Sequence, residues 1–380
     1  MELRFTEEQL ELQRIVRQFA RDEVAPAVGE MEAADAFPYA LVRKMAASGL
    51  MGIPIPKEQG GRGGDFISYI LAINELSRVS AAVGVILSVH TSVGTLPIQT
   101  YGSTEQRERF VKKLATGEWI GAFALTEPHA GSDAGAIRTT AVKQGDHYVV
   151  NGSKLFITNA EAAELFVLFA VTDRSKGARG ITAFLVERGL TGFQIGRKEK
   201  KMGLHGSSTC ELVLDGVRVH ESKRLGAEGE GFAIAKGTLD GGRIGIGAQA
   251  LGIAEAALQL MQERLLTAKG EIAIKRGKVA HEFVTLANLT AQVEAARLLV
   301  YHAAYLRQSG IPCTKEASMA KMYASDTAML TAGEAVRLLS RSGQSSAQAE
   351  RLFRDAKVTQ IYEGTNEIHR IVIGNQLLKS

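Results

Sequence analysis

The sequence predicts an α+β protein in which a β-rich segment separates two helical segments. In residues 1–120, apolar side chains such as Leu10 and Phe19 recur at helical spacing. Residues 121–227 carry short apolar runs between turn residues, which is typical of a small sandwich or barrel. Helical spacing returns in residues 228–380. We therefore expect an N-terminal α-helical domain, a middle β domain and a C-terminal α-helical domain with these three ranges.

The bulk composition fits such a chain and excludes several classes of protein. The 380 residues suit two or three domains, and the net charge of +4 comes without a lysine or arginine block, so no nucleic-acid partner is expected. Cys210 and Cys313 lack metal or redox spacing, which predicts no metal site and favours a reducing compartment. The N-terminus has no secretory apolar region, and no apolar run of about 18 residues is evident. We expect no membrane span and a cytoplasmic location.

The N-terminal helices are signalled by their caps and apolar stripes. Thr6 and Gln9 fit a capping box at the first helix. Residues 67–79 and 83–93 predict two further apolar helices. The Gly60–Gly64 stretch predicts a loop, and it matches no phosphate-binding pattern.

The middle segment is dominated by β-prone runs. Asn151-Gly152 lies between two such runs within Asp146–Ile157, which predicts a β-hairpin turning at that dipeptide. Further strands are expected at Leu165–Val171, Ile181–Val186 and Thr209–Val219. In the C-terminal segment, the apolar face from Leu286 to Ala303 and the run Asp326–Leu339 predict helices.

One carboxylate near the C-terminus has an environment suited to a base. Glu363 lies between the apolar pair Ile361-Tyr362 and Gly364. Apolar neighbours disfavour the charged carboxylate and raise its pKa, which suits general-base catalysis near neutral pH. The alternative from the residues alone is an ordinary solvated surface glutamate.

The segment Ile361–Arg370, IYEGTNEIHR, resembles the C-terminal active-site segment of the acyl-CoA dehydrogenases, in which this glutamate is the catalytic base. The resemblance extends from Phe5 to near Leu378 and includes the order helices, strands, helices. It implies the acyl-CoA dehydrogenase-like fold, with a central β-barrel or sandwich and a C-terminal four-helix bundle. It also implies Glu363 as the catalytic residue and Gly364 as a substrate contact.

A second segment, Ala124–Gly135, resembles the first signature of that family, a Thr-Glu-Pro turn that runs into Gly-Ser-Asp. From composition alone it is a surface turn, because its residues are the usual turn formers. The resemblance implies that it forms a flavin-binding wall, and that Ser132 also contacts substrate. The implied flavin contacts are Phe123, Leu125, Thr126 and Ser132.

Two further groups of cofactor-binding residues follow from the resemblance. Phe156, Ile157 and Thr158 match a strand end that packs on the flavin ring, and Phe156 stands where many relatives carry tryptophan. The alternative for Phe156 is a plain core residue. Thr365 and Glu367 match positions that reach the dinucleotide part of FAD.

The segment Thr238–Gly245 resembles the substrate helix of the family. Asp240 and Arg243 match positions near the thioester and pantetheine, whereas a capping aspartate and a surface arginine are the plain alternative. Some branches place the base immediately before this arginine. Gly242 occupies that position here, so the resemblance assigns the base to Glu363.

Two elements of the family are altered in this chain. An Arg-x-x-Phe-Gly segment is absent from Arg264–Lys275, and a Gln-x-x-Gly-Gly-x-Gly turn is replaced by residues Arg337–Gly343. In the family both reach a neighbouring subunit's FAD. Compensating positive charge is available from Lys269, Arg337 and Arg341.

The implied activity is FAD-dependent α,β-dehydrogenation of an acyl-CoA thioester to the trans-2-enoyl-CoA, as in fatty-acid β-oxidation. Residues 82–90 resemble the part of butyryl-type enzymes that lines the acyl pocket, which favours a short chain. The implied partners are acyl-CoA, an electron-transfer flavoprotein and a homotetramer built as a dimer of dimers. The alternatives are a homologue that keeps the fold and binds acyl-CoA but holds FAD poorly, with little or no activity, and an oxidase that uses oxygen directly.

Overall fold

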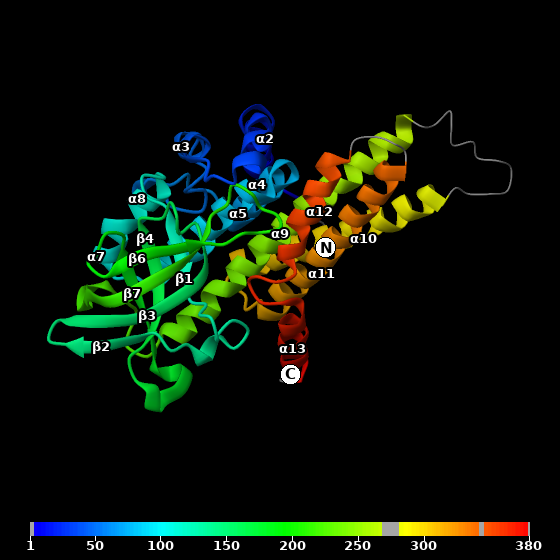
Figure 1. The fold of residues 1–380 in the computed structure, drawn as a ribbon. Helices are drawn as coiled ribbons and strands as arrows, with labels where there is room; N and C mark the ends of the chain where they lie inside the picture. The colour runs from blue at the N-terminus through cyan, green and yellow to red at the C-terminus, as the bar shows by residue number, and fades with distance from the viewer. Residues whose placement is uncertain (1–3, 268–280, 342–345, 379–380) are drawn as a thin grey trace.

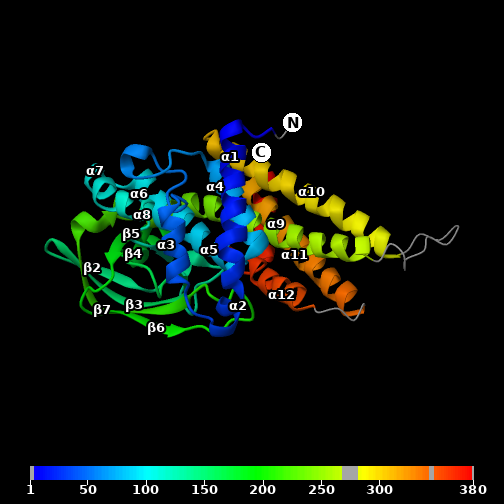
Figure 2. The same ribbon diagram turned by 90° about the horizontal axis from the view of Figure 1, so that it is seen from above.

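The computed structural model describes residues 4–267, 281–341 and 346–378. Its sheet lies at one end and its long C-terminal helices at the other, and N-terminal helices cover both along one side (Figure 1). Figure 2 shows α1 beside α4, where the sheet region meets the C-terminal helices. This arrangement confirms the predicted order of helical, β and helical regions.

The N-terminal region is helical, as expected. The Thr6 side chain accepts a hydrogen bond from Gln9 N, and the Gln9 side chain accepts one from Thr6 N, so the capping box is confirmed. The helix expected over 83–93 is instead an α-helix that passes into a π-helix. The elements are α1 (Glu7–Phe19), π-helix η1 (Ala20–Val24), α2 (Ala25–Ala34), α3 (Tyr39–Ala47), α4 (Phe66–Val79), α5 (Ala81–Ser88), π-helix η3 (Val89–Thr95), α6 (Leu96–Tyr101), α7 (Thr104–Gln106), π-helix η4 (Arg107–Val111) and α8 (Lys112–Ala115).

Hydrogen bonds connect the strands of the middle region into one eight-stranded sheet. The order is β6-β7-β3-β2-β4-β5-β8, and β1 pairs in parallel with β4 beside this path. The strands are β1 (Gly121–Ala124), β2 (Thr140–Gln144), β3 (His147–Thr158), β4 (Leu165–Val171), β5 (Ile181–Glu187), β6 (Phe193–Lys198), β7 (Thr209–His220) and β8 (Arg224–Leu225).

The predicted hairpin turn at Asn151-Gly152 is wrong. Both residues lie within the continuous strand β3, where the register against β7 shifts between Val150 and Gly152. Gly152 has φ +148°, so this glycine serves a bulge and not a two-residue turn. The chain reverses earlier, between β2 and β3, where Gly145 has φ +64°.

The C-terminal helices pack side by side and include the two that were expected. The run Asp326–Leu339 is the second half of a longer helix. The elements are α9 (Gly231–Thr267), α10 (His281–Gln308), α11 (Thr314–Arg341), α12 (Ala347–Thr359) and α13 (Asn366–Leu377).

Helix α9 carries glycines where it meets the N-terminal helices. A Cβ at Gly245 would lie 2.6 Å from Ser88 Oγ, and one at Gly252 would lie 2.6 Å from the Asn74 carbonyl oxygen. Because real Cβ contacts are longer, Gly252 allows the α9 backbone to lie directly against the backbone of α4, and Gly245 leaves room for the Ser88 hydroxyl.

Two helical stretches, Ala81–Tyr101 and Gly231–Thr267, are long and apolar enough to cross a membrane by length and composition. Both pass on average hydropathy, and neither is a continuous apolar run, since they contain polar residues such as His90 and Asp240. In addition, 94% and 89% of their most apolar windows are buried inside the protein. Core packing explains their hydrophobicity, and they are weak evidence for a membrane span.

Candidate active site

The Glu363 loop, residues 360–365, connects α12 to α13. Thr365 caps α13 by accepting a hydrogen bond from Ile368 N. Glu363 has φ +56° and Gly364 has φ +94°. A left-handed conformation at a glutamate is unfavourable by about 1 kcal/mol or more, and such residues concentrate at functional sites. The loop therefore presents Glu363 in a conformation that its surroundings must enforce.

The Glu363 carboxylate lies in a slot on α9 that exists because residue 242 is glycine. A Cβ at Gly242 would lie 2.7 Å from Glu363 Oε2. Oε2 is buried and has no hydrogen-bond partner in the described part of the chain. Burial raises the pKa of Glu363 to about 7, although the nearby charges of Arg243 and Lys321 act to lower it. The carboxylate can therefore accept a proton near neutral pH.

Polar groups on α9 and α11 surround this slot. Asp240 Oδ1 accepts a hydrogen bond from Arg243 Nη1 at 3.1 Å, and Asp240 Oδ2 accepts one from Thr314 Oγ1 at 2.6 Å. Asp240 lies inside α9, so it does not cap that helix, and the Arg243 side chain is only 13% exposed. The buried Arg243 Nε has no partner among the described residues, so it remains available to a ligand.

The ends of β1 and β3 lie together and form the proposed flavin wall. Leu155 N donates to the Thr126 carbonyl at 2.8 Å, which joins the segment after β1 to β3. Leu125 and Ile157 are buried, whereas Phe123, Thr126 and Thr158 are half-buried.

Phe156 is exposed at this wall and is not a core residue. Its side chain is 57% exposed, and its backbone is left-handed with φ +59°. The hydroxyls of Thr126 and Thr158 have no hydrogen-bond partner among the residues that the structure describes. An exposed aromatic ring beside free hydroxyls fits a flat heterocycle that needs both stacking and hydrogen bonds. The residues present therefore fit a flavin ring.

The remaining predicted site residues lie apart from these two groups. Ser132 is exposed on the loop after β1, and the Glu367 side chain is 78% exposed on α13. In the described part of the chain, no hydrogen bond or ion pair joins Phe156 or Ser132 to the Glu363 loop. Arg337 donates to Glu334 on its own helix. Lys269, residues 268–275, residues 342–343 and the side chain of Arg341 lie outside the described residues.

Sequence reasoning missed two buried lysines beside the candidate site. Lys154 is fully buried, and its Nζ lies 2.8 Å from Glu127 Oε1 and 3.0 Å from the Leu125 carbonyl oxygen. Lys321 is fully buried beneath the Glu363 loop. The sequence signal that could have identified a buried lysine is its position on an otherwise apolar face of an element. Lys321 falls among Ala317, Ala320 and Ala324, all buried on one side of α11.

We expect Gly242→Ala to slow the reaction of the site without weakening the helix. The new methyl group would occupy the position 2.7 Å from the Glu363 carboxylate and displace it by a few tenths of an ångström. A misplacement of this kind costs roughly tenfold in rate, since about 1 Å costs up to 10²-fold. The measurement is the rate of flavin reduction by substrate together with the melting temperature.

Gly333→Ala on α11 is the matched control for this prediction. Its Cβ would lie 3.7 Å from the Phe353 ring, which is an ordinary contact, and alanine favours a helix by about 1 kcal/mol over glycine. We expect this variant to keep its rate and melt no lower than the parent. Equal rates for the two variants would contradict the slot.

Three comparisons with known proteins agree with this geometry. Models described as the N-terminal, middle and C-terminal domains of acyl-CoA dehydrogenase match residues 6–118, 122–217 and 229–378. An "Acyl-CoA dehydrogenase" of Bacillus subtilis is 54% identical and covers 98% of each chain, and an "Acyl-CoA dehydrogenase, short-chain specific" of Clostridium acetobutylicum is 47% identical over 100% of each. The solved butyryl-CoA dehydrogenase of Megasphaera elsdenii is 44% identical over 100% of each chain, with a TM-score of 0.94.

Proposed function

Because the chain belongs to the acyl-CoA dehydrogenase family, we propose that Glu363 is the base that takes the α-proton of a short-chain acyl-CoA. The protein is an oxidoreductase and its cofactor is FAD, as in relatives solved "in complex with FADH2" and "complexed with FAD". The observation that carries the proposal is the carboxylate held in the Gly242 slot with its pKa raised to about 7.

The residues of the chain account for the proton and for the charge of the thioester. Glu363 accepts the α-proton, and the electron pair of that C–H bond becomes the new C=C bond as hydride leaves the β-carbon. FAD, when bound, supplies the hydride acceptor at the wall of Phe123, Leu125 and Thr158. The Glu363 N–H has no hydrogen-bond partner among the described residues, so it is free to donate to the thioester oxygen as negative charge develops there.

Two aromatic residues of α4 favour the inference that the substrate carries a short acyl chain. A Cβ at Gly241 would reach the Phe66 ring at 3.9 Å. Tyr69 is fully buried, and its hydroxyl donates to the Ser88 carbonyl at 2.9 Å. Burial raises the pKa of Tyr69 well above its usual range, and the charge of Glu363 adds to this rise. We infer that these rings and α5 close the acyl pocket after a few carbons.

Membership of this family also suggests the partners, the assembly and the location of the protein. Electron acceptance by an electron-transfer flavoprotein is supported by a 45% identical structure described as "Electron transferring flavoprotein of Acidaminococcus fermentans: Towards a mechanism of flavin-based electron bifurcation", with a TM-score of 0.95. A homotetramer made of two dimers, a cytoplasmic location and domain boundaries at residues 120 and 227 remain proposals. The comparisons favour the active dehydrogenase over the homologue with little FAD.

Anaerobic bleaching of the FAD-loaded protein tests the proposal. Acyl-CoA thioesters of increasing length would be mixed with the protein, and the loss of flavin absorbance would be followed with time. We expect the fastest bleaching with straight chains well below about eight carbons, since pocket discrimination is modest for each methylene. Absence of bleaching with every thioester would contradict the activity, and a maximum beyond that length would contradict the substrate class.

We also expect FAD to dissociate from this protein more readily than from relatives that keep the Arg-x-x-Phe-Gly segment and the Gln-x-x-Gly-Gly-x-Gly turn. Losing one hydrogen bond to a charged group costs roughly 1.5–3 kcal/mol, or about one to two decades in affinity. Protein purified without added FAD should be partly apo, and added FAD should raise its melting temperature, because a ligand of the folded state stabilises it. Stoichiometric FAD after extensive dialysis would show that other groups have replaced the lost contacts.

A further inference from the structure

Lys321 is a charged residue placed where an alanine would otherwise be expected. It lies on the buried face of α11 among small side chains and is 0% exposed. Burying an ammonium group is costly unless hydrogen bonds and charges compensate it. In the proposed reaction Glu363 accepts the α-proton, so Lys321 is not needed as a proton acceptor and its burial calls for another role.

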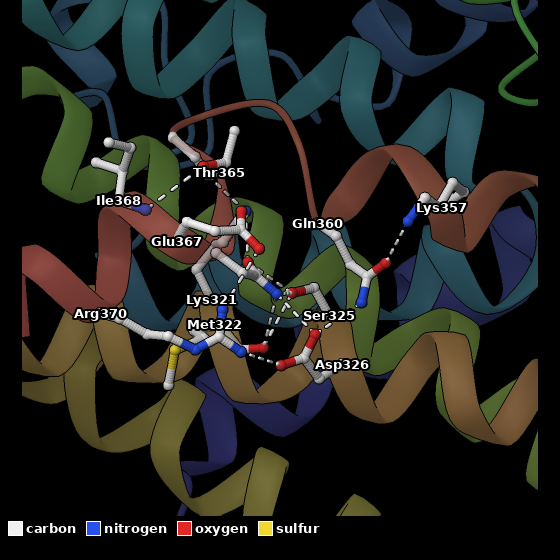
Figure 3. Close-up of polar contacts among 12 residues, drawn as sticks. Lys321, Met322, Ser325, Asp326, Lys357, Gln360, Thr365, Glu367, Ile368 and Arg370 are labelled. Atoms are coloured by element: carbon white, nitrogen blue, oxygen red, sulfur yellow. Dashed lines mark hydrogen bonds and ion pairs between the residues drawn. The ribbon is translucent and has the colours of Figure 1, made fainter. Parts of the chain in front are cut away.

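The hydrogen bonds of Lys321 go to the Glu363 loop. Lys321 Nζ donates to the Gly364 carbonyl at 2.7 Å and to Asn366 Oδ1 at 2.9 Å. Asn366 is itself tied to α11, because its Nδ2 donates to Ser325 Oγ at 2.9 Å and to Asp326 Oδ1 at 2.8 Å. Figure 3 shows Lys321, Ser325 and Asp326 on α11 beneath the loop and the start of α13. The lysine therefore binds the peptide that directly follows the base.

We propose that Lys321 is a positioning residue that holds the left-handed Glu363–Gly364 turn, so that the carboxylate stays in the Gly242 slot. This inference rests on the proposed role of Glu363. The turn is fixed from two sides, because α11 holds the Gly364 carbonyl and α9 receives the carboxylate. Without the lysine, the Gly364 carbonyl loses its buried donor, and the unfavourable conformation at Glu363 loses one of its supports.

Lys321 also sets the electrostatic environment of the base. Its positive charge lowers the pKa of Glu363, and the charge of Glu363 in turn raises the pKa of Lys321, which burial nevertheless brings down to about 7. Removing this cation should therefore raise the pKa of Glu363 further. The titratable and charged groups that face the pair are Arg243 on α9, Asp326 on α11, Glu367 and His369 on α13, Tyr69 on α4, and Tyr362.

The His369 side chain is uncharged and packs against the Glu363–Gly364 turn. It is 0% exposed, and neither ring nitrogen has a hydrogen-bond partner among the described residues. Burial and the charges of Lys321 and Arg243 lower the pKa of His369 to about 3. A Cβ at Gly364 would lie 3.3 Å from this ring, so the ring leaves little room for the turn to rearrange. Since His369 is neutral, Lys321 supplies the positive charge on this side.

The test compares Lys321→Met, Lys321→Arg and the control Lys357→Met in FAD-loaded protein. Lys357 is an exposed lysine just before the loop, and it donates only to Gln360 Oε1 among the described contacts. Anaerobic flavin reduction by butyryl-CoA would be measured as a function of substrate concentration and pH. Melting temperature and bound FAD would be recorded for each variant, to separate folding from positioning.

For Lys321→Met we expect the maximal rate of flavin reduction to fall about 10–100-fold with little change in the half-saturating substrate concentration, as for a misplaced base. The acidic limb of its pH–rate profile should move to higher pH, because the cation that stabilises the carboxylate is gone. Lys321→Arg keeps the positive charge, but the guanidinium group differs in shape from the ammonium group that binds the Gly364 carbonyl. Its rate should fall while its acidic limb stays near that of the parent, and this variant tests the proposal even if Lys321→Met does not fold.

The outcomes separate this inference from the proposed function. If the parent bleaches and Lys321→Met behaves like Lys357→Met in both rate and pH profile, the positioning role is wrong. Equal loss of rate in the two Lys321 variants, with an unmoved acidic limb in both, would contradict the electrostatic part. If the parent itself does not bleach with any thioester, the assignment of Glu363 fails first.

Discussion

Glu363→Gln is expected to stop flavin bleaching while leaving the fold and the bound FAD intact. The amide has the size of the carboxylate and fits the slot left by Gly242, where Oε2 has no hydrogen-bond partner among the described residues to lose. An amide cannot accept the α-proton, and loss of general-base action costs about 10²–10⁴-fold in rate. The measurement is anaerobic stopped-flow bleaching by butyryl-CoA, with FAD content and melting temperature determined in parallel.

The control for this variant is Glu108→Gln, which makes the same chemical change at an exposed position on η4. It should bleach at the parental rate. The parental rate should also rise with pH through about 7, since the base acts only when it is deprotonated and burial raises its pKa to that value. Bleaching by Glu363→Gln at the parental rate would show that another group takes the proton.

Lys154→Met is expected to have the largest effect on stability. Lys154 and Glu127 are 0% and 2% exposed, and Glu127 also accepts hydrogen bonds from Arg138 N at 2.6 Å and Thr139 N at 3.0 Å. Removing the lysine leaves a buried carboxylate without its cation, a change that costs roughly 3–5 kcal/mol. For a chain of this length the melting temperature should fall by about 5 °C, given the unfolding entropy per residue.

The same change should loosen FAD, because this pair supports the segment that carries Leu125 and Thr126. Lys143→Met provides the control on the neighbouring strand β2, where the lysine is 50% exposed and pairs with Glu221. Exposed pairs contribute little, so this variant should melt like the parent. The double variant Lys154→Met with Glu127→Gln should recover part of the loss, and a normal melting temperature for Lys154→Met alone would show that the pair is not structurally important.

The sequence predicted the features that depend on local pattern. The capping box at Thr6 was readable because both partners lie within one turn of helix. The order of helical and β regions followed from apolar periodicity, whereas Glu363 as the base is a proposal that the resemblance around it suggested. The sequence showed that residue 242 is glycine and therefore carries no side chain. Its physical meaning, a space that holds the carboxylate, required the packing of α9 against the loop.

The features that were missed depend on tertiary structure. An Asn-Gly pair usually marks a turn, but here β3 pairs with β7 both before and after residues 151–152. The dipeptide therefore forms a bulge within the strand. Lys154 and Lys321 meet their partners only in the folded chain, since Lys321 bonds to residues more than 40 positions away. A lysine on a buried helical face signals a partner without identifying it.

The glycines of α9 constrain how this scaffold can change its substrate preference during evolution. Because the backbone of α9 touches the backbone of α4 at Gly252, any side chain there would require the two helices to separate, and a side chain at Gly245 would have to displace the Ser88 hydroxyl. Separation would also move Gly242 away from Glu363. Descendants of this chain are therefore restricted in altering the proposed acyl pocket by sliding or spreading these helices. The accessible route is exchange of individual side chains such as Phe66 or Tyr69, so variation in chain length among descendants should be recorded on α4 and α5, with the glycines of α9 unchanged.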